Sequence, residues 1–143
     1  RDRLVSRGLG DVYKRQFLKG LGMVHAISHM VGAEYDTQHG LTNAIILPVV
    51  MRYNLPGLEP KVARMAEVMG ISDRTADGFT AHLEALLDEI DIPKSLAAID
   101  VPFDCAPRIA EKALLDSAAA TNPRQAGVAD VRQMIETAIT AAR

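Results

Sequence analysis

The sequence is poor in cysteine and in aromatic residues, and it has no long hydrophobic run. Its single cysteine, Cys105, excludes an internal disulfide bond and is typical of a protein of the reducing cytoplasm. Tryptophan is absent, and aromatic residues make up 4% of the chain. The longest apolar run, residues 44–51, contains Pro48 and is much shorter than the roughly 18 residues of a membrane span. We therefore expect no transmembrane helix.

A strongly basic surface is missing as well. The net charge is −2, which argues against a nucleic-acid partner and against an anionic membrane surface. The first 16 residues lack the apolar core of a secretory signal peptide. Together these features predict a cytoplasmic protein with neither a nucleic-acid nor a membrane partner.

What the chain does contain is alanine, leucine, isoleucine and methionine at helical spacing. Hydrophobic residues make up 48% of the 143 residues, enough for one core. No segment alternates as a strand does, so we predict an all-α helical bundle of about six helices. The expected helices cover residues 17–31, 41–53, 62–69, 79–90, 107–120 and 128–139, with Ser72 or Asp73 capping the fourth.

Residues 1–16 have a separate explanation. The stretch SRGLGDVYKRQ resembles, residue for residue, one reading frame of a transposase adapter used in short-read sequencing, and we interpret it as an assembly artefact. The native chain would then begin near Phe17, with further sequence lost upstream. Residues 1–16 hold five basic and two acidic residues, so without them the net charge moves from −2 to −5. The alternative is a natural basic arm.

Three of the four histidines lie in the stretch HAISHMVGAEYDTQHG. His25 and His29 are four residues apart and share one face of a helix. His39 would lie about 21 Å from His25 on one continuous helix, too far to share an ion. The turn-rich residues 32–40 remove this objection, because a break there can bring His39 back towards the first helix.

Two interpretations of these histidines remain open on spacing alone. Imidazole suits Zn²⁺ or Fe²⁺, and Glu34 and Asp36 are nearby candidate acids. Alternatively, the histidines are hydrogen-bonded core residues, since HxxxH without the glutamate of HExxH is a weak signal. His82, among charged and polar residues, is expected to face solvent.

The string GMVHAISHMVGAEYDTQHGLTNAIILPVVMRYN resembles the second signature region of the iron-containing (group III) alcohol dehydrogenases. IPKSLAAIDV and ALLDSAAATNPR follow in the order that this family shows. The resemblance implies a protein of two domains. An N-terminal α/β domain would bind NAD(P), and residues 17–143 would be an incomplete part of the helical, dehydroquinate synthase-like, metal-binding domain.

The resemblance also implies roles for the three histidines. His25 and His39 match the last two metal ligands, for Fe²⁺ or Zn²⁺. His29 matches a histidine beside the nicotinamide and substrate, and it is our candidate for catalysis, proton relay and cofactor contact. The other two ligands, an aspartate and a histidine, and the glycine-rich segment that binds NAD or NADP would lie upstream. Gln38 stands where relatives have proline, which would alter only the helix start.

The resemblance implies an NAD(P)-linked, metal-dependent alcohol dehydrogenase that acts on a small alcohol or aldehyde. It also implies that the complete protein is a homo-oligomer. The metal would polarise the alcohol or carbonyl oxygen during hydride transfer. The NAIILP run would form a dry wall beside the site, and Asn43 would orient His39 or join two helices. We expect TNPR to be a loop that ends a helix, and we do not expect Arg124 to bind an anion. Residues 1–143 alone are expected to be inactive and to bind metal weakly.

Two alternatives remain. Glycerol dehydrogenases, maleylacetate reductases and hydroxyacid–oxoacid transhydrogenases share the scaffold, and the sequence does not separate them. A non-catalytic helical binding module, complete as it stands, is the other alternative. It would have residues 1–16 packed into its core.

Overall fold

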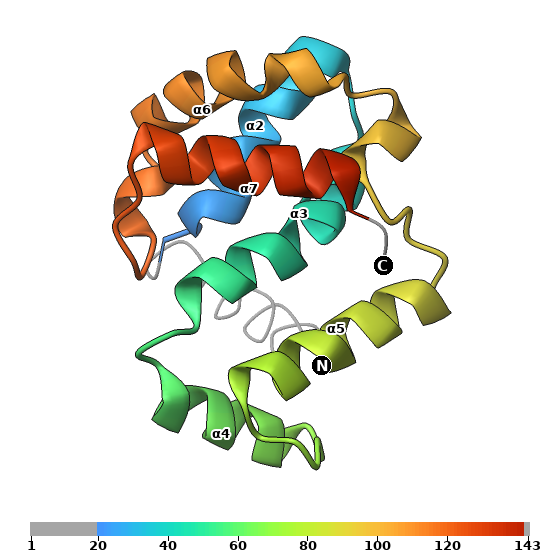
Figure 1. Ribbon diagram of the computed structural model, residues 1–143, viewed down its shortest axis with the longest axis vertical. Helices are drawn as coiled ribbons and strands as arrows, with labels where there is room; N and C mark the ends of the chain where they lie inside the picture. The colour runs from blue at the N-terminus through green and yellow to red at the C-terminus, as the bar shows by residue number, and fades with distance from the viewer. Residues whose placement is uncertain (1–19, 142–143) are drawn as a thin grey trace, which may run out of the picture.

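Two antiparallel helices, α2 and α3, lie at the centre of the computed structural model, which describes residues 20–141 (Figure 1). The described part of the chain is all-α and contains no strand, as predicted. No described helix is both long and apolar enough to cross a membrane. The α-helices are α2 (Gly22–Tyr35), α3 (His39–Asn54), α4 (Glu59–Val68), α5 (Ala76–Glu89), α6 (Ala106–Leu115) and α7 (Val128–Thr140), and the 3₁₀ turns are η1 (Leu96–Ile99), η2 (Phe103–Cys105) and η3 (Ala119–Thr121).

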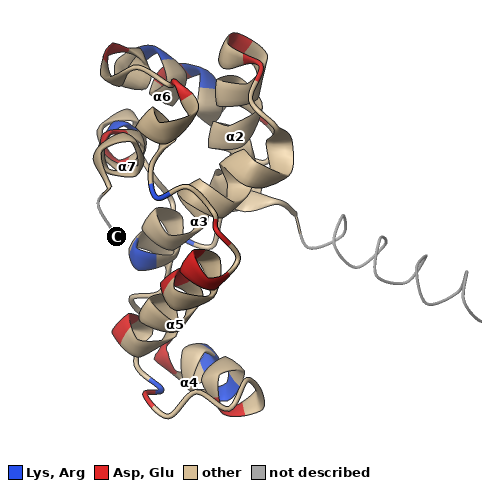
Figure 2. Ribbon diagram, turned by 90° about the vertical axis from the view of Figure 1, so that its right-hand side faces the viewer, with Lys and Arg blue, Asp and Glu red and all other residues tan. Residues whose placement is uncertain are grey.

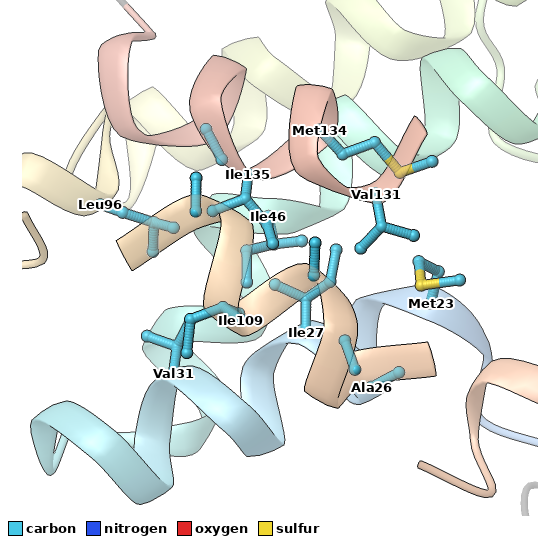
Figure 3. Packing of buried hydrophobic residues seen from close by; sticks show 14 of the residues in the cluster. Met23, Ala26, Ile27, Val31, Ile46, Leu96, Ile109, Val131, Met134 and Ile135 are labelled. Atoms are coloured by element: carbon cyan, nitrogen blue, oxygen red, sulfur yellow. The ribbon is translucent and has the colours of Figure 1, made fainter. Parts of the chain in front are cut away.

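The main core lies between α2, α3, α6 and α7 (Figure 3). The buried face of α2 repeats every three or four residues, as in an amphipathic helix. Small residues on α6 allow the neighbouring helices to approach closely. A second, smaller cluster joins the end of α3 to α4 and α5. The main core includes Met23, Ala26, Ile27 and Val31 of α2, Ile45, Ile46 and Val50 of α3, Ile109, Ala110 and Ala113 of α6, and Val131, Ile135 and Ala138 of α7.

The break between α2 and α3 is shorter than the sequence predicts. We expected it over residues 32–40, but α2 continues to Tyr35 and α3 begins at His39. Asp36 ends α2 in the left-handed conformation, with φ of 53°, and its N–H donates to the Gly32 carbonyl at 2.9 Å. The Gln38 side chain accepts from the Leu41 N–H and caps α3. A glycine within a helix is tolerated when packing holds both flanks, so Gly32 does not end α2.

Other boundaries and one cap also differ from the prediction, since α4 begins at Glu59 rather than residue 62 and α5 at Ala76 rather than residue 79. Thr75, rather than Ser72 or Asp73, caps α5 by accepting from the Gly78 N–H, while Asp73 accepts from Thr75. The helix expected over residues 107–120 ends at Leu115, because the backbone turns to an extended conformation at the next residue. The predicted apolar face of α5 is only partly buried, with the side chains at positions 86 and 90 exposed. His82 is exposed, as predicted.

The TNPR segment ends η3 and holds the start of α2. The Gly22 N–H donates to Thr121 Oγ1 at 3.3 Å, and the Met23 N–H donates to Asn122 Oδ1 at 3.1 Å. Asn122 and Asn54 also exchange amide hydrogen bonds of 3.0 and 2.8 Å. One loop side chain therefore satisfies an N–H at the beginning of α2 and fixes the end of α3.

Arg124 has a structural role and is not positioned as a free anion ligand. Its guanidinium donates to the Tyr53 carbonyl at 3.0 Å and lies 4.3 Å from the centroid of the Tyr53 ring. The cation–π contact and the hydrogen bond hold the loop against the last turn of α3.

The proposed artefact, residues 1–16, lies outside the described residues, as do positions 17–19 at the expected start of the first helix. The interpretation of that stretch as non-native, and the alternative in which it packs into the core, both stay predictions.

Replacing Ile109 by alanine is expected to lower the free energy of unfolding by about 2–5 kcal/mol, because it leaves a cavity where α6 meets α2 and α7. Val68→Ala, at a side chain 81% exposed, is the control and should change it by less than about 0.5 kcal/mol. Urea unfolding followed by circular dichroism measures both. Equal effects of the two variants would contradict this assignment of the core.

Candidate metal and catalytic site

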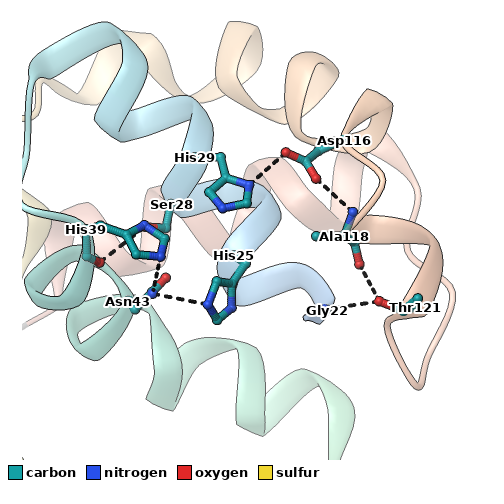
Figure 4. Close-up of polar contacts among 9 residues, drawn as sticks. All are labelled: Gly22, His25, Ser28, His29, His39, Asn43, Asp116, Ala118 and Thr121. Carbon is teal, nitrogen blue, oxygen red and sulfur yellow. Dashed lines mark hydrogen bonds and ion pairs between the residues drawn. The ribbon is translucent and has the colours of Figure 1, made fainter. Parts of the chain in front are cut away.

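The three histidine rings gather where α2 meets the first turn of α3 (Figure 4). His25 and His29 are one turn apart on α2, and the short reversal places His39 at the start of α3. The ring centroids are 5.8 Å apart for His25 and His29, 5.3 Å for His25 and His39, and 5.3 Å for His29 and His39. The break thus brings together the three residues that the sequence singles out.

Ser28 orients the His39 ring. The buried Ser28 hydroxyl lies 3.2 Å from His39 Nδ1 and 3.5 Å from the His39 carbonyl oxygen. Donation from the hydroxyl to that carbonyl leaves the serine oxygen to accept from Nδ1–H, which places the lone pair of His39 on Nε2. A serine one position before His29 carries no recognisable sequence signal, so Ser28 is not among the predicted site residues.

The Asn43 side chain lies between His25 and His39. Its Nδ2 lies 3.0 Å from His39 Nε2 and 3.5 Å from His25 Nε2. An amide N–H₂ only donates, so both Nε2 atoms accept from it through their lone pairs. The Asn43 Oδ1 is buried and forms no hydrogen bond with any described residue. Both expected roles of Asn43 are therefore present, since it contacts His39 and connects α3 to α2.

His25 is kept neutral by its surroundings. Its pKa lies below the ordinary value of 6.5, first because partial burial disfavours the charged ring, and then because His39 and His29 repel a positive charge. The Leu21 carbonyl favours a proton on the ring and opposes this shift. His25 Nδ1 nevertheless makes no hydrogen bond of normal geometry with a described group. Metal binding requires a neutral imidazole, which this environment favours.

His29 has a different partner. Its Nδ1 lies 2.8 Å from Asp116 Oδ2, and Asp116 Oδ1 accepts from the Ala118 N–H at 2.7 Å. Burial alone would raise the pKa of Asp116, but the hydrogen bonds from the Ala118 amide and His29 lower it overall. Asp116 is not among the predicted site residues, because the residue spacing predicts one continuous helix over residues 107–120. Its position directly before the SAAATNPR segment was the available signal.

Glu34 and Asp36, the acids expected near the histidines, serve other purposes. Glu34 accepts from Arg108 and from Lys112 Nζ at 3.2 Å, which joins the end of α2 to α6. Figure 2 shows acidic and basic residues of these two helices together at one end of the molecule. Asp36 ends α2. Neither acid is hydrogen-bonded to a histidine in the described structure.

The dry wall expected from NAIILP is only partly present. Ile45, Ile46 and Pro48 are buried on the core side of α3 rather than beside the histidines. A hollow of about 270 Å³ does open next to His25, and its other lining residues are mainly apolar. They are Leu21, Val24, Asn43, Ala44 and Leu47.

The described residues supply part of a metal site. Among residues 20–141, no group of three histidine, cysteine or acidic side chains is arranged to hold a metal ion. His25 and His39 nevertheless point their Nε2 lone pairs at the same amide nitrogen, as two ligands of one ion must point at that ion. The donor set therefore fits a metal that needs further ligands from elsewhere.

Comparison with known proteins identifies the family. The sequence profile described as "Fe-containing alcohol dehydrogenase family, C-terminal" matches residues 18–139. The chain belongs to the Fe-containing alcohol dehydrogenase family. This confirms the resemblance carried by the histidine string and by the two later segments.

Similar proteins include a lactaldehyde reductase and a 1,3-propanediol dehydrogenase. The chain is 36% identical over 125 residues to the lactaldehyde reductase of Escherichia coli (strain K12), covering 83% of this chain and 33% of that protein. It is 40% identical over 111 residues to the 1,3-propanediol dehydrogenase of Klebsiella pneumoniae, covering 73% and 29% respectively. The chain thus spans about a third of the length of these relatives.

Solved structures confirm the fold. The crystal structure of a 1,3-propanediol oxidoreductase superposes with a TM-score of 0.78 at 36% identity, covering 82% of this chain and 32% of that one. A maleylacetate reductase from Agrobacterium tumefaciens superposes with a TM-score of 0.66 at 27% identity, covering 87% and 33%.

The ion cluster of Glu34 gives a pH-dependent prediction. The Arg108 guanidinium, with Lys112, lowers the pKa of Glu34 from 4.5 to about 2. The ionised Glu34 carboxylate therefore stabilises the folded state fully above pH 4.5, and this stabilisation is lost as the pH falls towards about 2. Glu34→Gln should flatten the fall of the unfolding temperature over that range. Circular dichroism melts at several pH values measure it. Glu67→Gln, which removes an exposed carboxylate paired with Arg74, is the control, and an equal flattening in that variant would refute the assignment.

Proposed function

We propose that this chain is part of the helical domain of an NAD(P)-linked, metal-dependent alcohol dehydrogenase acting on a small alcohol or aldehyde. The observation that carries the proposal is the convergence of the His25 and His39 Nε2 atoms on one point, in a chain of the Fe-containing alcohol dehydrogenase family. The similar lactaldehyde and propanediol enzymes support the substrate class.

His25 and His39 would hold the metal, Fe²⁺ or Zn²⁺. The Ser28 oxygen would accept from His39 Nδ1–H, which leaves Nε2 of His39 as the ligand atom, and burial with the neighbouring histidines lowers the pKa of His25, which favours its neutral, metal-binding form. When bound, a divalent cation supplies Lewis-acid polarisation of the substrate oxygen. The remaining ligands would come from outside the described residues, because residues 20–141 provide two.

His29 would exchange a proton with the substrate oxygen rather than bind the metal. Its Nδ1 donates to Asp116. Its Nε2 is hydrogen-bonded to no described residue, so Nε2 is available to accept a proton. The ring is stacked on His39 with centroids 5.3 Å apart, so a substrate held at the two ligands would lie within reach. Its side chain is 36% exposed, open to a nicotinamide bound by another domain.

The hollow beside His25 would receive the carbon chain of the substrate. Its walls from Leu21, Val24, Ala44 and Leu47 are apolar, and its volume of about 270 Å³ suits a small molecule. Excluding water there would strengthen the hydrogen bonds that the histidines make.

A second candidate is a reductase of a different carbonyl compound on the same scaffold. The structural similarity to a maleylacetate reductase favours this candidate. A substrate screen on the complete protein distinguishes them, because maleylacetate is a dicarboxylate and an apolar hollow disfavours it.

The chain itself should bind Zn²⁺ or Co²⁺ weakly, through His25 and His39. His25→Ala and His39→Ala should each abolish the binding measured by isothermal titration calorimetry, because one imidazole does not retain the ion. His82→Ala, at an exposed histidine on α5, is the matched control and should bind as the parent does. Retained binding in both site variants would refute the ligand assignment.

In the complete protein, His39→Ala should remove bound iron or zinc and lower kcat/KM for a small alcohol with NAD or NADP by at least about 10³-fold, as expected when Lewis-acid stabilisation is lost. Elemental analysis and steady-state kinetics give the two readouts. A complete protein that contains no metal and keeps full activity in the variant would contradict the proposed function.

A further inference from the structure

We infer that Asp116 is a positioning residue that holds His29 in the tautomer with its proton on Nδ1, which leaves Nε2 as the acceptor in the site. The inference deepens the proposed function and rests on it for the role of His29 in proton transfer. The contact that carries it is the 2.8 Å hydrogen bond between His29 Nδ1 and Asp116 Oδ2. A carboxylate only accepts, so the nitrogen facing it carries the proton.

The carboxylate is held in place from its other side. Asp116 Oδ1 accepts from the Ala118 N–H at 2.7 Å, and the Asp116 side chain is 14% exposed. With one oxygen bound to the backbone and the other to the imidazole, the carboxylate has little freedom to rotate. The His29 ring is therefore fixed in orientation as well as in tautomer.

The segment that carries Asp116 is attached to α2 at a second point. Thr121 Oγ1 accepts from the Gly22 N–H and donates to the Ala118 carbonyl, so Ala118 contributes to both attachments (Figure 4). Gly22 and His29 are seven residues apart, about two helical turns. These two attachments fix where the loop after α6, and Asp116 within it, lies along the axis of α2.

A purely structural tether is the competing explanation, and the structure already provides one. Buried residues of α2 and α6 pack directly against each other, and the Glu34 ion cluster joins the same two helices. Asp116 adds something that neither of these contacts supplies, a proton acceptor directed at one nitrogen of His29. Figure 4 shows the rings of His39 and His25 on the side of His29 away from Asp116, where its free nitrogen lies.

Asp116→Asn separates the two explanations. Asparagine keeps an oxygen that accepts from the Ala118 N–H, but it presents N–H₂ to His29 Nδ1. The ring should then move its proton to Nε2, which removes the acceptor from the site, as when the aspartate of a catalytic triad is replaced by asparagine. Asp116→Glu retains a carboxylate and should retain part of the wild-type behaviour.

The first experiment is ¹⁵N NMR of histidine-labelled chain, residues 1–143, which reports the protonated nitrogen of each ring. We expect His29 to be protonated on Nδ1 in the wild type and on Nε2 in Asp116→Asn. Asp130→Asn is the matched control, because Asp130 also accepts a backbone N–H, from Gly127, at the start of α7. A wild-type His29 protonated on Nε2, or an unchanged tautomer in Asp116→Asn, would overturn the inference.

The second experiment measures turnover by the complete metal-loaded protein. Asp116→Asn should lower kcat by at least about 10²-fold, with KM within about threefold, because general-base catalysis contributes about that much. Asp116→Glu should recover part of the loss, and Asp130→Asn should match the wild type. A loss of kcat no larger than that of the control would also overturn the inference. The NMR experiment needs no turnover, so it decides the tautomer even if the proposed function fails.

Discussion

The reversal between α2 and α3 is the constraint on which the candidate site depends. A left-handed residue at Asp36 ends one helix, and Gln38 caps the next, so that only residues 36–38 separate them. A longer loop would move His39 away from the turn of α2 that carries His25. The core packing of Ala26, Ile27 and Ile46 then holds the two helices at the distance at which their polar side chains contact each other.

On α2 the site and the core use opposite faces. On α2 the apolar residues recur every three or four positions and are buried, and His25 and His29 occupy the remaining face. Ser28 is the exception, because it is buried and polar and uses its hydroxyl to orient His39. The packing of the core therefore also positions the imidazoles, because it fixes the helix backbone from which their side chains extend.

Much of this could be predicted from the sequence, but the polar partners could not. The helical class, the exposure of His82 and the shared face of His25 and His29 follow from residue spacing along single helices, and the turn-rich residues after His29 indicate a break that could return His39 to them. The prediction was wrong where a local signal was overruled by packing. Gly32 did not end α2, and the isoleucines of NAIILP faced the core rather than the site. Asp116 was missed because residues 107–120 read as one helix, although the backbone turns at the aspartate itself.

The sequence by itself determined which residues are able to act: an i, i+4 pair of histidines, a third histidine after a break, and the family to which the whole segment belongs. Helical periodicity is local, so a window of a few residues reveals it. Only the tertiary structure decided how these residues are held. Asp116 reaches His29 across 87 positions, and Asn122 reaches Asn54 across 68. Such contacts arise because packed helices bring distant segments together, and no local pattern encodes the distance between two side chains that meet only after folding.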